Sequence, residues 1–397
     1  MGGGIIIAAS YEAKAFGVHT GMRLSEARKL VPGAIERAVD FRETGLASEQ
    51  IETILQGTCP LLEQMSIDEW YMDLRSIIGG VPVNLSAWAT SLRERILRKT
   101  GLSMSVGIAP TKLLAKMASE YRKPGGVTAI QRIMNQESGI MEKRKIHNSY
   151  FIIHDSLKSF LRDRPAAAIP GIGRQTEPKV AARGWKTAWD IANAPTEELV
   201  NILGRPGREM QSELLGRPVA TITTDPAPPK SVSRARSFWK NRDRNFLWAH
   251  LLRHLEYLVL KMRREGMMCR GISVWLRDGE YRFHNANRSL PQAFATEDQL
   301  LPFVRKCFQE ILAINNQQQA TQIGLALWRL TSSAPCQYSL FEDPLRHERS
   351  DNVQKAIDTL HEQFGRNAVT RASALEVKSG TQRGLNFSTY ELRSWGS

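Results

Sequence analysis

The chain has 397 residues, which exceeds one typical domain and favours about two to four domains. Its hydrophobic content of 42% suffices for packed cores, and it lacks any run of about eighteen apolar residues that would indicate a membrane span. Lysine and arginine number 54 against 40 acidic residues, a net charge of +14 that favours a polyanionic partner, nucleic acid before an anionic membrane. A solvated basic face is the simpler explanation of such an excess, so the motifs must decide.

The N-terminus and the cysteines narrow the class of protein further. The opening "MGGGIIIAAS" has no basic segment before its short apolar stretch, so we expect no signal peptide and a cytoplasmic location. The four cysteines, Cys59, Cys269, Cys307 and Cys336, lie far apart without CxxC spacing. They are therefore interpreted as reduced thiols rather than zinc ligands or disulfide partners.

Residues 1 to about 60 are expected to alternate a short apolar strand, "IIIAAS", with helices at "RLSEARKLV" and "ASEQIETILQG". The next segment, "QMSIDEWYMDL", spans residues 64–74. Its apolar residues occupy odd positions before Asp68 and even positions after Glu69, a switch that one straight strand cannot make. We predict two short strands joined by a hairpin or bulge, with both carboxylates at the bend.

Two adjacent carboxylates on a bend between buried strands could hold divalent cations, because hard ions such as Mg²⁺ prefer carboxylate oxygens on rigid elements. A solvent-exposed acidic turn is the alternative interpretation of Asp68 and Glu69. The apolar frame on both sides favours the first interpretation, because a bend between buried strands is a rigid platform, and the site would face the polyanion that the net charge of +14 attracts.

A helix at "VNLSAWATSLRERILRKTG", a strand at "LSMSVGIAP" and a helix at "TKLLAKMASEYRK" follow, and this mixed α/β region is expected to end near residue 165. The second helix ends at "PGG" and carries Arg122 and Lys123 in its last turn. Basic residues there can simply complement the partial negative charge of a helix C-terminus.

Residues 166 to about 228 read as short helices followed by the proline-rich linker "TTDPAPPK". The turn "PGIGRQ" places Gly171, Ile172, Gly173 and Arg174 between helical segments. Its glycines would let backbone N–H groups approach a phosphate, as in helix-hairpin-helix modules, although a plain helix connection is an equal alternative. Arg174 and the nearby Arg205 and Arg208 favour the DNA-binding interpretation.

Residues 229 to about 332 predict a separate α+β module with a basic strand, two helices and a hairpin that turns at Asp278-Gly279. In "SRARSFWKNR", Arg234 and Arg236 would share one face, which suits either a phosphate backbone or plain solvation. Trp239, Trp275 and Trp328 are interpreted as core residues.

From residue 333 the chain turns polar, except for the apolar patch "QYSLF" at residues 337–341. Such a patch fits a docking peptide, or a segment folded back onto its own domain. A helix is expected near residues 351–364, followed by a tail that is expected to be partly disordered.

Together these segments resemble the Y-family translesion DNA polymerases of the bacterial lesion-bypass group, the UmuC-like or ImpB-MucB-SamB polymerases. "SYEAKAFGVHTGM" is similar to the fingers motif, "MSIDEWYMDL" to the catalytic carboxylate motif, "SVGIAPTKLLAKMASEYRKPGG" to the palm motif and "IPGIGRQ" to the thumb hairpin. The four occur in the family's order, and a weaker likeness extends to about residue 330.

The resemblance implies an α+β multidomain right-hand polymerase. Its parts would be fingers at residues 1–60, a palm at 61–165, a helix-hairpin-helix thumb at 166–228, a little finger at 229–332 and a C-terminal tail at 333–397. It implies template-directed addition of deoxynucleotides opposite damaged bases, in DNA repair and the SOS response. The expected partners are primer-template DNA, deoxynucleoside triphosphates and the sliding clamp, with a monomeric chain and no membrane.

The resemblance also assigns roles to residues. Asp68 and Glu69 would be catalytic ligands of two Mg²⁺ ions, Tyr11 and Lys14 would contact the incoming nucleotide, and Lys123 would neutralise its phosphates. Lys14 replaces an arginine that is common in the family, which keeps the charge but loses the bidentate fork. Gly171, Ile172, Gly173, Arg174, Arg234 and Arg236 would bind DNA, and Gln337, Leu340 and Phe341 match the anchors of the clamp-binding peptide.

The sequence departs from the family pattern at its start, which follows the strand that normally carries a further metal-binding aspartate. Asp73 lies at the wrong place in the motif to replace it. One interpretation is that Met1 is an internal methionine of a complete polymerase. The other is a non-catalytic, DNA-binding and clamp-docking relative, and on either we expect weak activity of this chain. A nuclease that uses the same carboxylates would leave the other motifs without a role.

Overall fold

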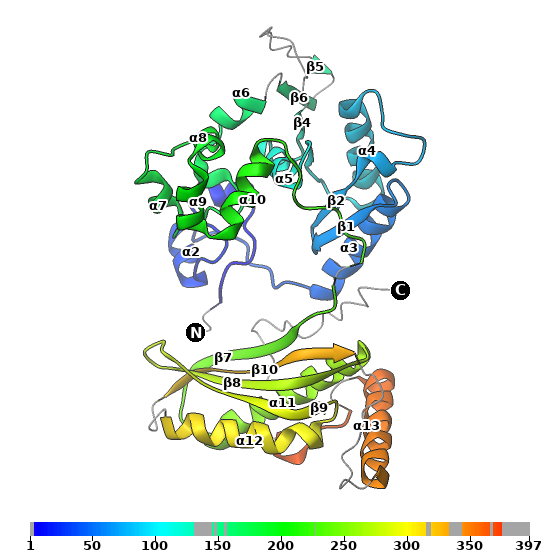
Figure 1. The fold of residues 1–397 in the computed structure, drawn as a ribbon, viewed down its shortest axis with the longest axis vertical. Coiled ribbons are helices and arrows are strands. Elements are labelled where there is room, and N and C mark those ends of the chain that lie inside the picture. The colour runs from blue at the N-terminus through cyan, green and yellow to red at the C-terminus, as the bar shows by residue number, and fades with distance from the viewer. Residues whose placement is uncertain are drawn as a thin grey trace. The chain divides into compact units, whose positions relative to one another are not determined.

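The computed structural model describes residues 4–130, 145–146, 149–154, 157–225, 227–314, 319–332, 344–365 and 368–374. These residues form two compact units. The central unit takes the described residues of Ile35–Pro226, and the flanking unit takes those before and after it in sequence. Figure 1 shows the elements of both units. No helix among these residues combines the length and apolarity that crossing a membrane requires.

The N-terminal part of the flanking unit contains two short helices, α1 (Tyr11–Ala15) and α2 (Leu24–Leu30). Ser10 caps α1 by accepting a hydrogen bond from the backbone N–H of Ala13. The strand expected at "IIIAAS" is wrong, because Ile5 makes only an isolated bridge with Arg23. Ile5 and Ile7 are exposed. The apolar pattern was not enough to form a strand here, because no neighbouring strand among the described residues pairs with this segment.

The central unit begins with α3 (Phe41–Gln56), the hairpin β1 (Leu62–Ser66) and β2 (Glu69–Met72), the 3₁₀ turn η1 (Leu74–Ser76) and α4 (Leu85–Thr100). Both helices pack on the hairpin through a small core that includes Ile51, Leu62 and Ile96. Asn84 caps the start of α4, and Gly101 ends it with a left-handed φ of 72°. The predicted helix and its glycine stop are thus confirmed.

A four-stranded sheet follows in the order β3 (Val106–Ile108), β4 (Val127–Ile130), β6 (Ser149–His154) and β5 (Lys145–Ile146). The first three strands are parallel, and β5 is antiparallel to β6. Helix α5 (Lys112–Tyr121) forms the crossover between β3 and β4. A side chain at Gly107 would place its Cβ 2.1 Å from the carbonyl oxygen of Ala115, so glycine permits the close contact of β3 with α5.

The predicted helical region packs on the other side of α5. It comprises α6 (Leu157–Arg162), the 3₁₀ turn η2 (Ala166–Ala168), α7 (Glu177–Ala181), α8 (Ala188–Asn193), α9 (Thr196–Leu203) and α10 (Arg205–Leu214). Leu114 and Met117 of α5 lie in one core with Phe160, Ile191 and Leu214 from these helices. The buried carboxylate of Glu213 accepts hydrogen bonds from the backbone N–H groups of Leu113, Val219 and Ala220. It therefore fixes the start of the linker to α5.

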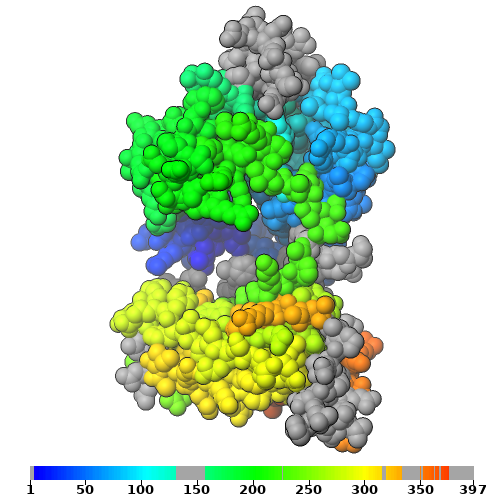
Figure 2. All heavy atoms as spheres, in the orientation of Figure 1, coloured from blue at the N-terminus to red at the C-terminus, as the bar shows by residue number. Residues whose placement is uncertain are grey.

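The larger part of the flanking unit is an antiparallel sheet covered on one face by two helices. Its order is β7 (Ser231–Asn241), β10 (Ala320–Ser332), β8 (Met267–Asp278) and β9 (Phe283–Phe294), and the helices are α11 (Arg244–Arg264) and α12 (Glu297–Ile314). Figure 1 shows α11 and α12 on the same side of this sheet, and Figure 2 shows α12 forming the surface below it. Alternate strand residues such as Ile272, Val274 and Ile323 enter the core with Leu255. The predicted α+β module and its hairpin are confirmed.

The interpretation of three tryptophans as core residues is wrong. Trp239 is 90% exposed, and Trp275 and Trp328 lie half-buried on the sheet face opposite the core. The ring of Trp275 lies over Gly324 and that of Trp328 over Gly271, where an added Cβ would come within 2.4 Å of a ring atom. Bulk and apolarity predicted burial, but in a one-sided sheet the strand parity puts these side chains on the open face.

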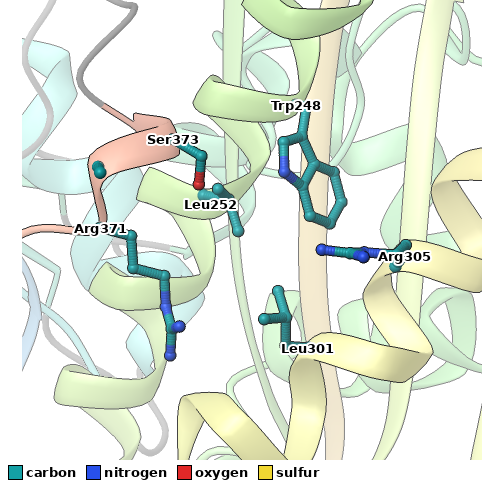
Figure 3. A pocket seen from close by; sticks show the side chains of 7 residues that line it. Trp248, Leu252, Leu301, Arg305, Arg371 and Ser373 are labelled. Carbon is teal, nitrogen blue, oxygen red and sulfur yellow. The ribbon is translucent and has the colours of Figure 1, made fainter.

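The C-terminal part continues with α13 (Pro344–Phe364), which contains the helix predicted at residues 351–364, and the 3₁₀ turn η3 (Ala372–Ala374). Arg263 of α11 pairs with Asp358 at 2.9 Å, and Glu256 accepts hydrogen bonds from Thr370 and from the backbone N–H of Arg371. A pocket of about 460 Å³ lies between α11, α12 and this segment, and Figure 3 shows Trp248 and Arg305 beside it. Residues 368–374 are therefore folded against the helices of the sheet module.

Candidate active site

Asp68 and Glu69 lie at the tip of the β1–β2 hairpin, as the parity switch predicted. Asp68 belongs to the two-residue turn and Glu69 is the first residue of β2, paired with Ser66 across an irregularity in the register. The base of the hairpin is fixed by the hydrogen bond from the Asp73 N–H to the Leu61 carbonyl oxygen, at 3.0 Å. The tip thus stands on a locally rigid element.

The frame of the hairpin is less buried than the apolar pattern predicted. Met65 is 53% exposed and Ile67 36% exposed, whereas Trp70 and Met72 pack against the core of α3 and α4. The apolar residues just before the bend are therefore open to solvent, and the expectation of an apolar frame buried on both sides of the bend is wrong. One covered face is enough to orient a two-stranded hairpin, because α3 and α4 supply the missing layer.

The carboxylate of Asp68 is exposed and accepts one hydrogen bond, from Ser66 Oγ at 2.7 Å. Glu69 forms an ion pair with Lys116 of α5. Lys116 Nζ also lies 3.3 Å from Glu120 Oε1, and the same Glu120 oxygen accepts a hydrogen bond from Lys123 Nζ at 2.7 Å. Four side chains of alternating charge therefore lead from the hairpin along α5 to the "PGG" turn.

These contacts shift the pKa values of Lys116 and Glu120. Burial opposes the charged form of Lys116, but the hydrogen bond and charge of Glu69, together with Glu120, raise the pKa of this ammonium. Burial likewise opposes the ionised form of Glu120, and Lys123 and Lys116 outweigh it and lower the pKa of Glu120. Lys116 is thus protonated and Glu120 ionised at neutral pH.

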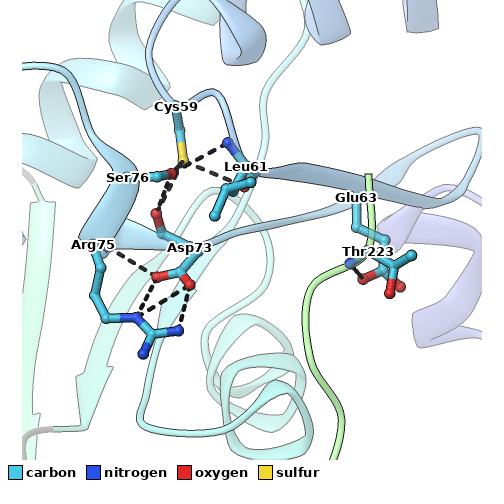
Figure 4. A network of polar contacts seen from close by, with 7 residues as sticks. All are labelled: Cys59, Leu61, Glu63, Asp73, Arg75, Ser76 and Thr223. Atoms are coloured by element: carbon cyan, nitrogen blue, oxygen red, sulfur yellow. Dashed lines mark hydrogen bonds and ion pairs between the residues drawn. The ribbon is translucent and has the colours of Figure 1, made fainter. Parts of the chain in front are cut away.

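Asp73 takes no part in this site. Its carboxylate accepts hydrogen bonds from the backbone N–H of Arg75 at 3.0 Å and from the Arg75 guanidinium, and this hydrogen bonding lowers the pKa of Asp73. Figure 4 shows Asp73 and Arg75 together with Cys59 and Ser76 at the base of the hairpin. Cys59 Sγ lies 3.1 Å from Ser76 Oγ and 3.2 Å from the Asp73 carbonyl oxygen, so this group closes the hairpin base.

The donor set at the hairpin tip fits a divalent cation. Asp68 has one carboxylate oxygen without a hydrogen bond among the described residues, and Glu69 is neutralised only by a long, partly exposed lysine. The described residues contain no group of three acidic, histidine or cysteine side chains that could enclose a metal ion. Mg²⁺ commonly uses one or two carboxylates and completes its shell with water or substrate phosphates, so these two carboxylates can hold an ion whose other positions are filled by water.

The predicted nucleotide-binding residues Tyr11 and Lys14 are neighbours on α1. Lys14 Nζ lies 4.9 Å from the centre of the Tyr11 ring, and Tyr11 is 48% exposed. Lys123, the third predicted residue, follows α5 and is held by Glu120. Lys14 thus lies beside the ring of Tyr11, and Lys123 beside the carboxylate of Glu120.

The turn at Gly171–Arg174 has the surface position that phosphate binding needs. Gly171 has a φ of 101°, and Ile172 is buried in the core of the helical region while its neighbours are exposed. The backbone N–H groups of Gly173 and Arg174 donate no hydrogen bond within the described part of the chain. Ile172 therefore serves as the anchor of an exposed turn rather than as a contact residue.

Arg234 and Arg236 share one face of β7, as predicted, but this face is the one that α11 covers. The Arg234 guanidinium lies 4.2 Å from the centre of the Tyr257 ring on α11. Arg236 is half-buried, and burial together with the charge of Arg253 lowers its pKa. Because β7 is an edge strand, these side chains reach the surface at the rim of the sheet and not on its open face.

One group of predicted site residues lies outside the described residues, and two charged residues near the hairpin tip were not predicted. Gln337, Leu340 and Phe341, the predicted clamp-binding residues, lie outside the described residues, as does Cys336. Lys116 and Glu120 were missed, although a signal existed: Lys116, Glu120 and Lys123 are spaced by four and three residues, which places them on one helix face.

Comparisons with known proteins match most of the chain. Residues 1–120 match the impB/mucB/samB family, and residues 229–340 match the C-terminal domain of the same family. A protein from Caulobacter vibrioides named DNA polymerase IV is 30% identical over 380 residues, which cover 94% of this chain and 86% of the relative. A protein of the same name from Methanoculleus marisnigri is 29% identical over 342 residues, which cover 86% of this chain and 87% of the relative.

Solved structures show the same fold. A Y-family DNA polymerase chimera of Dbh and Dpo4 superimposes with a TM-score of 0.67 at 21% identity, over 83% of this chain and 89% of that chain. An insertion ternary complex of Dbh DNA polymerase matches with a TM-score of 0.53 at 20% identity and the same coverage. The predicted α+β multidomain polymerase fold is thereby confirmed.

Proposed function

Because the chain belongs to the impB/mucB/samB family of Y-family DNA polymerases, we propose that it extends a DNA primer opposite template bases, damaged ones included. The reaction is nucleotidyl transfer in translesion synthesis and DNA repair, as the relatives named DNA polymerase IV indicate. The observation that carries this function is the hairpin tip with Asp68 and Glu69. The ion pair between Glu69 and Lys116 connects this tip to α5. The comparisons favour a polymerase over a non-catalytic relative.

Family membership implies the use of divalent metal ions, and we propose Mg²⁺ at a two-ion site. Asp68 and Glu69 would hold the ions, which supply a positive charge that stabilises the attacking and leaving oxygens. The exposed carboxylate of Asp68 and the displaceable partner of Glu69 support this assignment. Oxygens of the incoming nucleotide would complete the metal shell.

The deoxynucleoside triphosphate would meet three side chains. Tyr11 and Lys14 would contact it from α1, and Lys123 would neutralise its phosphates. Each ammonium group lies beside a side chain of its own unit, Lys14 beside the Tyr11 ring and Lys123 beside Glu120, which supports a defined local position for each charge. Preorganised positive charge lowers the cost of binding a polyanion in the reactive geometry.

Primer-template DNA is the proposed second substrate. The exposed turn at Gly171–Arg174 offers backbone N–H groups to a phosphate, and Arg234 and Arg236 offer charge at the rim of the sheet. We also propose that Gln337, Leu340 and Phe341 dock on the sliding clamp and that the chain acts as a monomer in the cytoplasm. The division into fingers, palm, thumb, little finger and tail remains part of this proposal.

Primer extension tests the assignment. With Mg²⁺ and a primed template, the chain should lengthen the primer, and Asp68→Ala should lower the rate by about a hundredfold or more, because a charge-stabilising group is lost. Asp73→Asn is the matched control, since Asp73 lies in the same segment but pairs with Arg75. Extension that Asp68→Ala leaves intact would refute the site, and a primer that shortens would point to the nuclease alternative.

A further inference from the structure

Lys116 is a charged residue beside the hairpin tip, and the function proposed above gives it no contact with a substrate or metal ion. Its ammonium pairs with Glu69 and lies 3.3 Å from Glu120 Oε1. The Lys116 side chain is 24% exposed, and those of Glu69 and Glu120 are 42% and 44% exposed. Lys116 therefore stands between two carboxylates that are both within its reach and both accessible to ions from solution.

A metal ion on Glu69 and the Lys116 ammonium compete for the same carboxylate. Glu69 has no other hydrogen-bond donor among the described residues, so Lys116 supplies the compensating charge when no ion is bound. A divalent cation in contact with Glu69 would repel an ammonium at this distance strongly, because the Coulomb energy scales with the product of the charges. Lys116 must then leave Glu69.

The structure offers Lys116 a second acceptor. Glu120 lies one helical turn further along α5 than Lys116, and Lys123 holds Glu120 Oε1 from the other side at 2.7 Å. This oxygen already lies 3.3 Å from Lys116 Nζ. Rotation about the last bonds of the lysine side chain is therefore enough to move the ammonium from Glu69 to Glu120. No backbone movement is needed.

We propose that Lys116 is a positioning residue, which holds the Glu69 carboxylate in place while the metal site is empty and moves to Glu120 when an ion binds. This inference rests on the metal site of the proposed function. It predicts that Lys116 lowers the affinity of the empty site for metal ions and that Glu120 partly restores it. The ion pair with Lys116 keeps the Glu69 carboxylate oriented, and Lys116 no longer competes for this carboxylate once the metal ion is bound.

The neighbouring pair of Lys112 and Glu63 shows what a structural ion pair looks like on the same helix. Lys112 contacts both Glu63 carboxylate oxygens at 2.7 Å, and the two side chains are only 16% and 15% exposed. Glu63 also accepts a hydrogen bond from the backbone N–H of Thr223, so this pair fastens the linker. Within the described ranges Lys112 has no second carboxylate partner, and it therefore provides the matched control.

The experiment measures Mn²⁺ binding to the full chain by electron paramagnetic resonance of the free ion, without DNA or nucleotide. Lys116→Met should tighten binding about fivefold, the lower end of typical coupling between two sites. Glu120→Gln should weaken binding, because Lys116 loses its alternative acceptor. Lys112→Met removes the same charge from the same helix without touching Glu69 or Glu120 and should change the affinity much less.

Glu69→Gln distinguishes a failure of the proposed metal site from a failure of the role given to Lys116. If Mn²⁺ binding does not depend on Glu69, the metal site fails and the role of Lys116 falls with it. If binding depends on Glu69 but Lys116→Met leaves it unchanged, or if Lys112→Met tightens it equally, only the role of Lys116 is overturned. Glu120→Gln gives an independent reading should Lys116→Met not fold, and unchanged or tighter binding in that variant would also overturn the role of Lys116.

Discussion

Asp278, at the end of β8, is a fully buried carboxylate that is nevertheless ionised. Its oxygens accept hydrogen bonds from the backbone N–H groups of Glu280 and Arg282, at 2.8 and 3.0 Å, and lie 3.0 Å from Arg282 Nε and from His284 Nε2. Burial raises the pKa of this carboxyl, but hydrogen bonds from His284 and Arg282 outweigh it and leave the pKa far below its usual value. Asp278 therefore fixes the β8–β9 turn.

Replacing Asp278 should reveal its stabilising role through pH. Because its folded pKa is lowered, the stabilisation is complete above the unfolded pKa of about 4 and is lost as pH falls through the folded value. Asp278→Asn should reduce the free energy of unfolding by about 3 kcal/mol at pH 7, as expected for a broken buried network. Urea denaturation at several pH values should show this difference narrowing below about pH 4.

Glu280→Gln is the control for this prediction. Glu280 pairs with Arg282 at 2.9 Å, but its side chain is 72% exposed, and exposed pairs contribute about 1 kcal/mol at most. A loss of stability equal to that of Asp278→Asn, or a pH-independent gap between native chain and Asp278→Asn, would contradict the role given to Asp278.

At the scale of elements, the contact between β3 and α5 determines the position of the α5 face that carries Lys116. Gly107 faces the helix backbone, where an added Cβ would lie 2.1 Å from the Ala115 carbonyl oxygen and 2.4 Å from the Ser119 nitrogen. Both are backbone atoms, so no side-chain rotation can relieve the clash. Since Lys116 lies between these two residues, the close approach of β3 also sets the position of its ion pair with Glu69.

Gly107→Ala should therefore separate the strand from the helix. We expect a loss of about 3 kcal/mol in the free energy of unfolding, at the upper end of typical overpacking, measured by urea denaturation with circular dichroism. Gly33→Ala is the control, because an added Cβ there meets no atom within 4 Å. Equal stability of the two variants would show that the β3–α5 contact is looser than the structure indicates.

At the scale of the whole molecule, the net charge of +14 comes mainly from the flanking unit, although each unit carries its own predicted DNA-binding residues. The central unit presents the turn at Gly171–Arg174, and the flanking unit presents Arg234 and Arg236. Binding that relies on phosphate contacts releases counterions, so the affinity for DNA should fall steeply with salt concentration.

The salt dependence gives a quantitative test of Arg174. If its side chain neutralises one phosphate, Arg174→Ala should reduce the slope of log affinity against log salt concentration by about 0.9, measured by fluorescence anisotropy with labelled duplex DNA. Arg183→Ala removes the same charge from the same helical region, but Arg183 pairs with Glu198. An equal change of slope in both variants would indicate general electrostatics rather than a contact at the turn.

The order of elements was largely predictable because it depends on local patterns. The parity switch at Asp68 predicted the hairpin, and the glycine at residue 101 predicted the end of α4. Arg234 and Arg236 were correctly expected on one face of a strand. These features follow from the geometry of a single chain segment, in which side-chain direction is set by position alone.

What covers each face depended on the tertiary structure. Trp239 and Met65 were predicted to be buried, but they are 90% and 53% exposed. The strand predicted to include Ile5–Ile7 has no partner strand in the part of the chain that the structure describes. Whether an apolar side chain is buried depends on which element packs over it, and distant segments supply that element.

The sequence by itself determined the family motifs, the carboxylate pair at a bend and the basic character of the chain. Only the tertiary structure brought Glu69 to Lys116 across 47 positions and Glu63 to Thr223 across 160. The reason is physical: charge and periodicity are properties of residues and segments, whereas the partner of each charge is fixed by long-range packing.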